Sequence, residues 1–359
     1  MKPSEIAQYR LVSQQIATSE IQTAPEMVKW FGAVQGQEYA QTKWGLGLRL
    51  PHLKEADIEN DLRKGRILRT HLLRPTWHFV ADQDIRWMLM LTAPRVHAAN
   101  AYMYRKLELE SKLFLRCHKI LLHALEGGKQ LTRDALKQEL KKIRITAEGF
   151  RLGYIMMHAE LEGLLCSGPR QGNQSTYMLL EERVPPCKMI TRDEALAELT
   201  RRYFSSRGPA TAKDFSTWSG LTLTECKKGI EFVRAAFHVV EIENEKYLFS
   251  DSGGPGLKPE DAIHLLPIYD EYIMGYKSRQ AIFLSFRSSK PKPALPFDST
   301  IILSGQVAGT WRRTIKPKSI ELEYDLFTSL NKNQKGLLEK AIVRFKKFTT
   351  SASDNTSVK

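Results

Sequence analysis

The sequence predicts an α+β protein in which three similar helical units, each ending in a β-hairpin, precede a small antiparallel β-barrel. Three observations lead to this fold class. With 359 residues, the chain is too long for one ordinary hydrophobic core. Helix-capping patterns and hairpins recur in the same order along residues 1–250. Beyond a glycine-rich stretch, the pattern changes to short β segments.

The clearest unit spans residues 186–250. A helix is expected over 191–205, and Thr211 is placed to cap a short second helix. Thr222 and Glu225 form a capping box that starts a third helix. The segments FHVVEI and KYLFS then predict a hairpin. Three helices followed by a hairpin are typical of a winged helix.

Two more winged-helix units are predicted from the same order of elements. In residues 111–185, Thr132 caps a helix, and a longer helix precedes the strands GLLCS and STYMLL. Residues 1–110 predict an expanded unit in which a helix near 54–64 precedes the strands RILRTHLL and TWHFV. The sequence thus predicts three tandem winged-helix units.

Residues 251–348 predict a small β-barrel closed by a helix. The stretch DSGGPGLKPE has the composition of a linker. Short apolar segments follow, namely IHLLPIY, QAIFLSF, STIILSG and QVAGTW, and a helix is expected over 331–347. The polar tail 349–359 is expected to be disordered.

The charge distribution points to a polyanionic partner. The chain has 54 Lys and Arg against 40 Asp and Glu, a net charge of +14. Residues 62–81, with a net charge of +5, and 272–320, with +8, hold 13 of these 14 charges. A charge run is often only a solvated surface, but two separate basic windows favour contact with DNA phosphates. The candidate contacts are basic side chains of the first hairpin and of the barrel loop: Arg69, His71, Arg74, His78, Arg287, Lys290 and Lys292.

Several function classes are excluded by what the sequence lacks. There is no apolar run long enough for a membrane helix and no secretory signal, so a cytoplasmic protein is expected. The four cysteines have no metal-ligand spacing, and neither a Walker loop nor a G-x-S-x-G or H-E-x-x-H motif occurs. His71 and His78 lack a third ligand, and Asp270-Glu271 is typical of a structural turn. We therefore expect no metal and no cofactor.

Four segments carry a resemblance to a known family: GAVQGQEYAQTKWGLGLRLP, RTHLLRPTWHFV, LLPIYDEYIMGYKSR and GTWRR. They resemble the AlkZ/YcaQ-type winged-helix DNA glycosylases along most of the chain. That resemblance implies three winged helices and a β-barrel curved around DNA, and excision of alkylated purines. One branch of the family has a Gln-aliphatic-Gln catalytic motif, and the other has Gln-aliphatic-Asp. The matching residues here are Gln35, Gly36 and Gln37, which places the chain nearer the AlkZ branch, with glycine in place of the aliphatic residue.

A glutamine side chain neither gains nor loses a proton near pH 7, yet it can assist the excision of one kind of damaged base. Alkylation at N7 or N3 makes a purine cationic, so the base leaves as a neutral molecule with little acid help. Two amide oxygens can then hold a water molecule and face the positive charge that develops on the sugar. We therefore expect a monofunctional DNA glycosylase that acts as a monomer on alkylated or crosslinked duplex DNA. The alternatives are a non-enzymatic winged-helix DNA-binding regulator and a protein-interaction scaffold.

The shape of the motif can also be predicted. Residues i and i+2 of an α-helix point about 200° apart, so Gln35 and Gln37 could not share one sugar from a helix. Glycine is unfavourable inside a helix, so Gly36 is typical of a position where a helix is interrupted. Residues 34–38 are therefore expected to form a loop or helix junction near residues 69–78, with both glutamines at least partly accessible.

Overall fold

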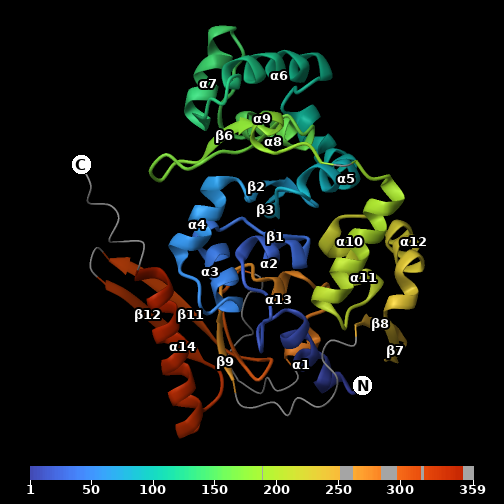
Figure 1. The fold of residues 1–359 in the computed structure, drawn as a ribbon, viewed down its shortest axis with the longest axis vertical. Coiled ribbons are helices and arrows are strands. Elements are labelled where there is room, and N and C mark those ends of the chain that lie inside the picture. The colour runs from blue at the N-terminus through green and yellow to red at the C-terminus, as the bar shows by residue number, and fades with distance from the viewer. Residues whose placement is uncertain (188, 251–261, 284–296, 317–318, 351–359) are drawn as a thin grey trace.

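The computed structural model describes residues 1–359 except 188, 251–261, 284–296, 317–318 and 351–359. Figure 1 shows an elongated molecule with the segment 111–185 at one end and the C-terminal sheet towards the other. Among the described residues, none of the helices combines the length and the apolar character that crossing a bilayer requires.

The first segment has the order helix, strand, helix, helix, strand, strand. Its elements are α2 (Ala24–Phe31), β1 (Ala33–Gln35), α3 (Tyr39–Arg49), α4 (Glu55–Lys64), β2 (Ile67–Leu72) and β3 (Thr76–Ala81). The helices α1 (Pro3–Ser13) and α5 (Ile85–Lys106) flank it. The antiparallel sheet has the order β1-β3-β2, so the short β1 is an edge strand that pairs only with β3.

A similar order of elements recurs in the next two segments. The second segment contains α6 (Ser111–Leu125), β4 (Leu131–Thr132), α7 (Arg133–Lys142), α8 (Gly149–Leu161), β5 (Leu165–Ser167) and β6 (Thr176–Leu179), and the short α9 (Leu180–Arg183) follows them in the chain. Its sheet order, β4-β6-β5, matches that of the first segment. The third segment contains α10 (Arg192–Arg207), α11 (Ala212–Ser219), α12 (Leu223–Val233), the 3₁₀ turn η1 (Arg234–Ala236), β7 (His238–Ile242) and β8 (Glu245–Phe249). A bridge between Ala210 and Leu248 takes the place of its first strand.

The C-terminal segment forms an open sheet. It contains β9 (Ile263–Leu266), α13 (Glu271–Met274), the 3₁₀ turn η2 (Gln280–Ile282), β10 (Thr300–Leu303), β11 (Gln306–Lys316), β12 (Ser319–Leu326) and α14 (Lys332–Thr350). The strand order is β12-β11-β10-β9, and the described residues show no closed barrel, so that prediction is wrong for them. Four strands are too few to close around a packed interior. Instead, α14 packs against β9 and α3.

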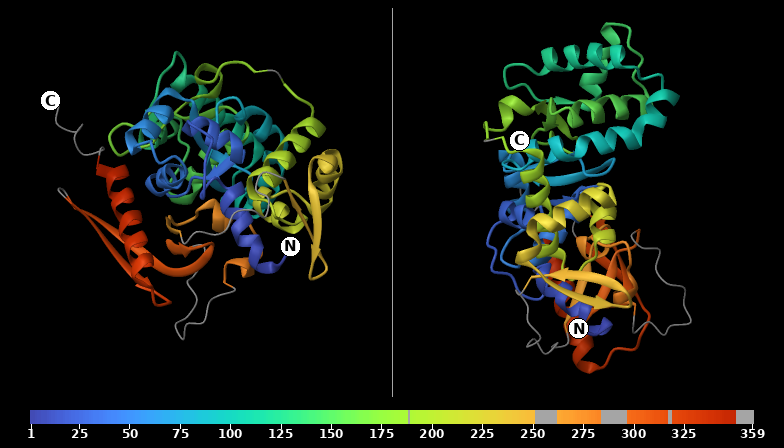
Figure 2. Two further views of the ribbon diagram at one scale, coloured as in Figure 1. Left: turned by 60° about the horizontal axis from the view of Figure 1, so that its bottom comes forward. Right: turned by 90° about the vertical axis from the view of Figure 1, so that its right-hand side faces the viewer.

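The first segment and the C-terminal sheet share one hydrophobic core. Phe345 of α14 lies between two tryptophans, with its ring centroid 5.0 Å from that of Trp44 and 5.0 Å from that of Trp311. A second core joins the other face of the β1-β3-β2 sheet to α5, α10, α11 and α12. The second segment has a core of its own. Figure 2 shows α14 and the β7–β8 hairpin on opposite sides of the molecule. Both faces of the first sheet are thus packed, which fixes the backbone of β1.

Candidate active site

The Gln35–Gly36–Gln37 motif continues the edge strand β1 towards α3. Gln35 is the last residue of β1 and lies opposite His78 of β3. The N–H of Gly36 donates to the carbonyl of Trp77 at 2.7 Å, so the pairing with β3 reaches one residue further. Residues 36–38 then lead into α3. Neither glutamine lies in a helix, as expected, but Val34 and Gln35 belong to a strand, so the predicted loop or helix junction over residues 34–38 is found only from Gly36 onwards.

Gly36 brings the backbone of the motif unusually close to β3. A β-carbon at this position would lie 3.0 Å from the carbonyl carbon and 3.1 Å from the α-carbon of His78. Both atoms belong to the backbone of a paired strand and cannot move as a flexible side chain does. The glycine therefore suits a motif that is held tightly against its neighbour.

The two glutamines differ in exposure. Gln37 is exposed, but Gln35 is only 4% exposed, so the expectation that both are accessible is wrong for Gln35. Gln35 is covered because its side chain is held within the protein: Arg74 Nη2 donates to Gln35 Oε1 at 2.9 Å. The backbone carbonyl of Gln35 accepts a hydrogen bond of 3.0 Å from the Thr42 hydroxyl.

A buried ion pair holds the free edge of β1. Glu271 of α13 accepts the backbone N–H of Gln35 at 2.7 Å through Oε1. Its other oxygen accepts from Arg207 Nη2 of α10 at 2.6 Å and from Trp218 Nε1 at 3.0 Å. Arg207 in turn donates to the carbonyl of Ala33 at 3.0 Å. The edge strand is therefore paired with β3 on one side and with a fully buried Arg–Glu pair on the other.

The neighbouring carboxylate of the same segment has a purely structural role. The carboxylate of Asp270 accepts hydrogen bonds of 2.8 Å from both Nη1 and Nη2 of Arg49. Its Oδ1 also accepts a hydrogen bond of 2.8 Å from the backbone N–H of Tyr272. This confirms the predicted structural turn at Asp270-Glu271. Sequence reasoning missed that Glu271 reaches the glutamine motif, and it did not single out Arg207. No local pattern signals their contact, because it joins segments that are far apart in the chain.

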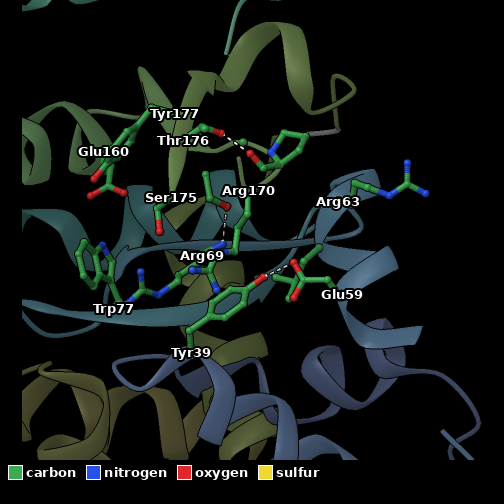
Figure 3. Close-up of a pocket in the computed structure, with 14 residues that line it drawn as sticks. Tyr39, Glu59, Arg63, Arg69, Trp77, Glu160, Arg170, Ser175, Thr176 and Tyr177 are labelled. Carbon is green, nitrogen blue, oxygen red and sulfur yellow. Dashed lines mark hydrogen bonds between the residues drawn. The ribbon is translucent and has the colours of Figure 1, made fainter. Parts of the chain in front are cut away.

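Beside the motif, alternating aromatic and guanidinium groups line a small cavity of about 30 Å³ (Figure 3). Arg69 donates to the carbonyl of Gly36 at 2.9 Å and to that of Gln37 at 3.2 Å, and it stacks on Trp77 at 3.8 Å from the ring centre. Arg170 of the second segment lies over the Tyr39 ring at 4.6 Å. Burial lowers the pKa of Arg69, and burial with nearby Glu59 raises that of Tyr39. The cavity therefore lies where the first and second segments meet.

The two histidines of the first hairpin lie inside the protein. His78 is fully buried, and burial lowers its pKa well below the usual value, so its ring is neutral at pH 7. His71 is buried as well and pairs with Glu160 of α8. The prediction that His71 and His78 contact DNA is therefore wrong for this structure. Arg69 and Arg74 lie at the motif, whereas Arg287, Lys290 and Lys292 fall outside the described residues.

Residues 28–348 match the sequence family of AlkZ-like DNA glycosylases. The chain belongs to this family. The interstrand DNA cross-link repair glycosylase of Streptomyces sahachiroi is 23% identical over 325 residues, which cover 86% of each chain. The solved structure of Streptomyces sahachiroi DNA glycosylase AlkZ matches with a TM-score of 0.77 and 19% identity, over 97% of this chain and 96% of that one.

Membership in the AlkZ-like family confirms the resemblance found in the sequence and the predicted enzyme class, a DNA glycosylase. The structural match extends over nearly the whole chain and shows that the mixed helix-and-sheet fold is AlkZ-like. Within the described residues, no group of three metal-ligating side chains lies at the glutamine motif.

Proposed function

We propose that this AlkZ-like protein hydrolyses the N-glycosidic bond of purines alkylated at N7 or N3 in duplex DNA, and that its substrates include bulky adducts and interstrand crosslinks. The observation that carries the proposal is the position of Gln35 and Gln37 at the end of an edge strand, outside any helix. The name of the Streptomyces relative, a cross-link repair glycosylase, supports the bulky substrate class. The protein acts as a monofunctional, cytoplasmic monomer on nucleoid DNA.

The alkylated purine is cationic and leaves as a neutral base, so the site has to stabilise the sugar and position water. Gln37 is exposed, and its amide oxygen accepts a hydrogen bond from the attacking water. The Gln35 oxygen accepts a hydrogen bond from Arg74 and retains a second lone pair. Because this side chain is only 4% exposed, its amide acts on the sugar through its dipole and not by direct contact. Arg74 thus fixes the orientation of the buried amide, and the dipoles are in place before the sugar becomes positive.

The three helical segments act as winged-helix units with boundaries 1–110, 111–185 and 186–250, followed by the C-terminal segment 251–348. Their repeated element order and the matching sheet orders of the first two support this interpretation. The cavity between the first two units adjoins the glutamine motif, so duplex DNA that crosses this junction reaches Gln37. Phosphate contacts come from Arg69, Arg74 and the basic loop with Arg287, Lys290 and Lys292.

The test uses duplex DNA with a single N7-methylguanine and measures strand cleavage at the resulting abasic site. Gln35→Ala and Gln37→Ala are each expected to slow single-turnover excision by about 100-fold and to change DNA affinity little, because they remove interactions made in the transition state. Gln37→Asp is expected to retain activity. The control is Gln83→Ala, an exposed glutamine outside the motif.

A non-enzymatic regulator is the competing function, and the same experiment separates the two. A regulator would leave the methylated duplex intact at every protein concentration and would select particular sequences from a random DNA pool. Either result for the wild-type protein would overturn the proposed activity on this lesion. Equal losses of excision and of DNA affinity in Gln37→Ala would instead overturn its assigned role.

A further inference from the structure

A second cluster of polar groups lies away from the glutamine motif, where α5 packs against α8. His97 belongs to α5, His158 to α8, and Glu162 is the C-cap residue of α8. Each offers one ligand atom, and these three atoms lie within 4.8 Å of one another. His118 of α6 adds a third imidazole, whose ring centre is 5.0 Å from that of His158.

We infer that His97, His158 and Glu162 bind a divalent zinc ion. Ligands of a tetrahedral zinc ion lie at about 2.0–2.2 Å from the metal and hence about 3.3–3.6 Å from one another. His97 Nε2 and Glu162 Oε1 are 3.2 Å apart and already form one edge of such a site. His158 and Glu162 are four residues apart at the end of one helix, which places them on the same face. The atom of His158 has to move inward by at most about 1.5 Å, a shift within reach of ring rotation.

The hydrogen bonds around the cluster also suit a metal. His97 Nδ1 is 2.9 Å from the hydroxyl of Tyr104, so a proton on Nδ1 leaves the lone pair of Nε2 facing Glu162. A ligating histidine is usually oriented in this way through its second nitrogen. His158 Nδ1 and His118 Nε2 are buried and have no hydrogen-bond partner among the described residues. Burial lowers the pKa of His158 to about 3, so its imidazole is neutral at pH 7, the form that binds metal.

The cluster is accessible from one side. A cavity of about 390 Å³ between α5 and the end of α8 is lined by His97 and Glu162 together with Met90 and Leu161. It provides an entry path and space for a water molecule as a further ligand. Two nitrogens and one carboxylate oxygen form a donor set that zinc accepts.

The ion would fasten the second segment to the long helix that follows the first. Glu160 lies two residues before Glu162 and pairs with His71 of β2, whose ring is 4.8 Å from that of Trp77. A metal that holds the end of α8 in place therefore also stabilises the pair between Glu160 and His71. Glu160 lines the small cavity beside the glutamine motif. Its role is structural, and it takes no part in the reaction proposed for Gln35 and Gln37.

The experiment measures zinc binding to the full-length, chelator-treated protein by calorimetry, with thermal unfolding as a second readout. One zinc ion per chain is expected, with a rise in Tm of roughly 4 °C at a free zinc concentration 100 times Kd. His97→Ala, His158→Ala and Glu162→Gln are each expected to weaken binding at least about 10-fold. His123→Ala is the matched control, because His123 also pairs with a glutamate but is exposed on α6.

Cobalt substitution keeps the test valid if a variant is less stable. Co²⁺ bound by nitrogen and oxygen ligands at a four-coordinate site gives intense visible absorption, which the wild type and His123→Ala are expected to show and His158→Gln to lose. Unfolding curves of the metal-free proteins separate loss of the site from loss of the fold. Absence of saturable binding to the wild type, or affinity that is unchanged in both His97→Ala and His158→Ala, would overturn the assignment.

Discussion

A β-carbon on Gly36 would lie 3.0 Å from the His78 backbone, and this distance accounts for the glycine in the centre of the motif. The family branches that the motif resembles have an aliphatic residue there. Such a residue needs a wider separation between β1 and β3 than this chain has. The exposed Gln37 and the buried Gln35 flank this contact, so the spacing of the two strands sets where both amides lie.

Gly36→Ala is expected to destabilise the protein by about 1–3 kcal/mol, because the paired strand β3 has to move to admit the methyl group. Excision is expected to fall as well, since the same shift displaces both glutamines. Urea unfolding and single-turnover excision are the measurements. Gly336→Ala on α14 is the control: a β-carbon there meets nothing within 4 Å, and alanine is expected to stabilise the helix slightly. Equal effects of the two substitutions would contradict this explanation.

Glu271→Gln is expected to destabilise the protein by about 3–5 kcal/mol, because it leaves the buried Arg207 without its counter-charge. The side-chain oxygen of the substituted residue can still accept the hydrogen bond from the backbone N–H of Gln35. The loss of stability therefore measures the ion pair and not that hydrogen bond. Chemical unfolding measures the change. Lys228→Met, which removes the exposed pair with Asp193, is expected to cost less than about 1 kcal/mol. A Glu271→Gln protein as stable as the wild type would show that Arg207 finds another partner.

At the scale of the elements, local signals in the sequence predicted most helices correctly. Thr132, Thr211 and Thr222 each accept the N-capping hydrogen bond that their positions predict. A cap depends only on residues three positions apart, so it can be predicted from the sequence alone.

The prediction failed where an element depends on distant contacts. The segment QAIFLSF was expected to be a strand, but its residues 280–282 form a 3₁₀ turn, and Ile282 is buried in the core shared by the first and last segments. Residues 284–286 of the segment lie outside the described residues. A short apolar run does not distinguish a strand from other buried structure. The strand β12 was not predicted, although its SIELEYDL sequence alternates between apolar and acidic residues. Likewise, the contact of Glu271 with Gln35 bridges segments that no local pattern connects.

The strand β9 carries a histidine that makes stability depend on pH. Burial, followed by nearby Arg344 and Arg49, lowers the pKa of His264 to about 4. Between pH 6.5 and about 4 the unfolded chain binds a proton at this residue and the folded protein does not, so the free energy of unfolding falls as the pH is lowered. The expected slope is about 1.4 kcal/mol per pH unit at most.

The test compares urea unfolding of His264→Gln and the wild type at pH 7 and pH 5. The variant is expected to lose less stability on acidification, and the other buried histidines account for the remaining slope. His123→Gln, which alters an exposed histidine, is expected to behave as the wild type does. Parallel pH curves for His264→Gln and the wild type would mean that His264 is protonated in the folded state.

At the scale of the whole molecule, the basic charge predicts how DNA binding responds to salt. The logarithm of the affinity is expected to fall with the logarithm of the salt concentration by about 0.9 per phosphate contact. Combined replacement of Arg287, Lys290 and Lys292 by alanine is expected to reduce this slope by up to about three. Lys227→Ala combined with Lys246→Ala, in the third segment, is the control. A slope that the triple replacement leaves unchanged would place that loop away from DNA.

The core shared by the first segment and the C-terminal sheet also determines when the protein can fold. Trp44 leaves the ribosome long before its partner Phe345 of α14 has been synthesised. The second segment has its own core and can fold while the chain is still growing. The sheet that carries the glutamine motif therefore keeps one apolar face uncovered until α14 has been synthesised. A nascent chain that stops before α14 is therefore expected to expose this face to chaperones and proteases.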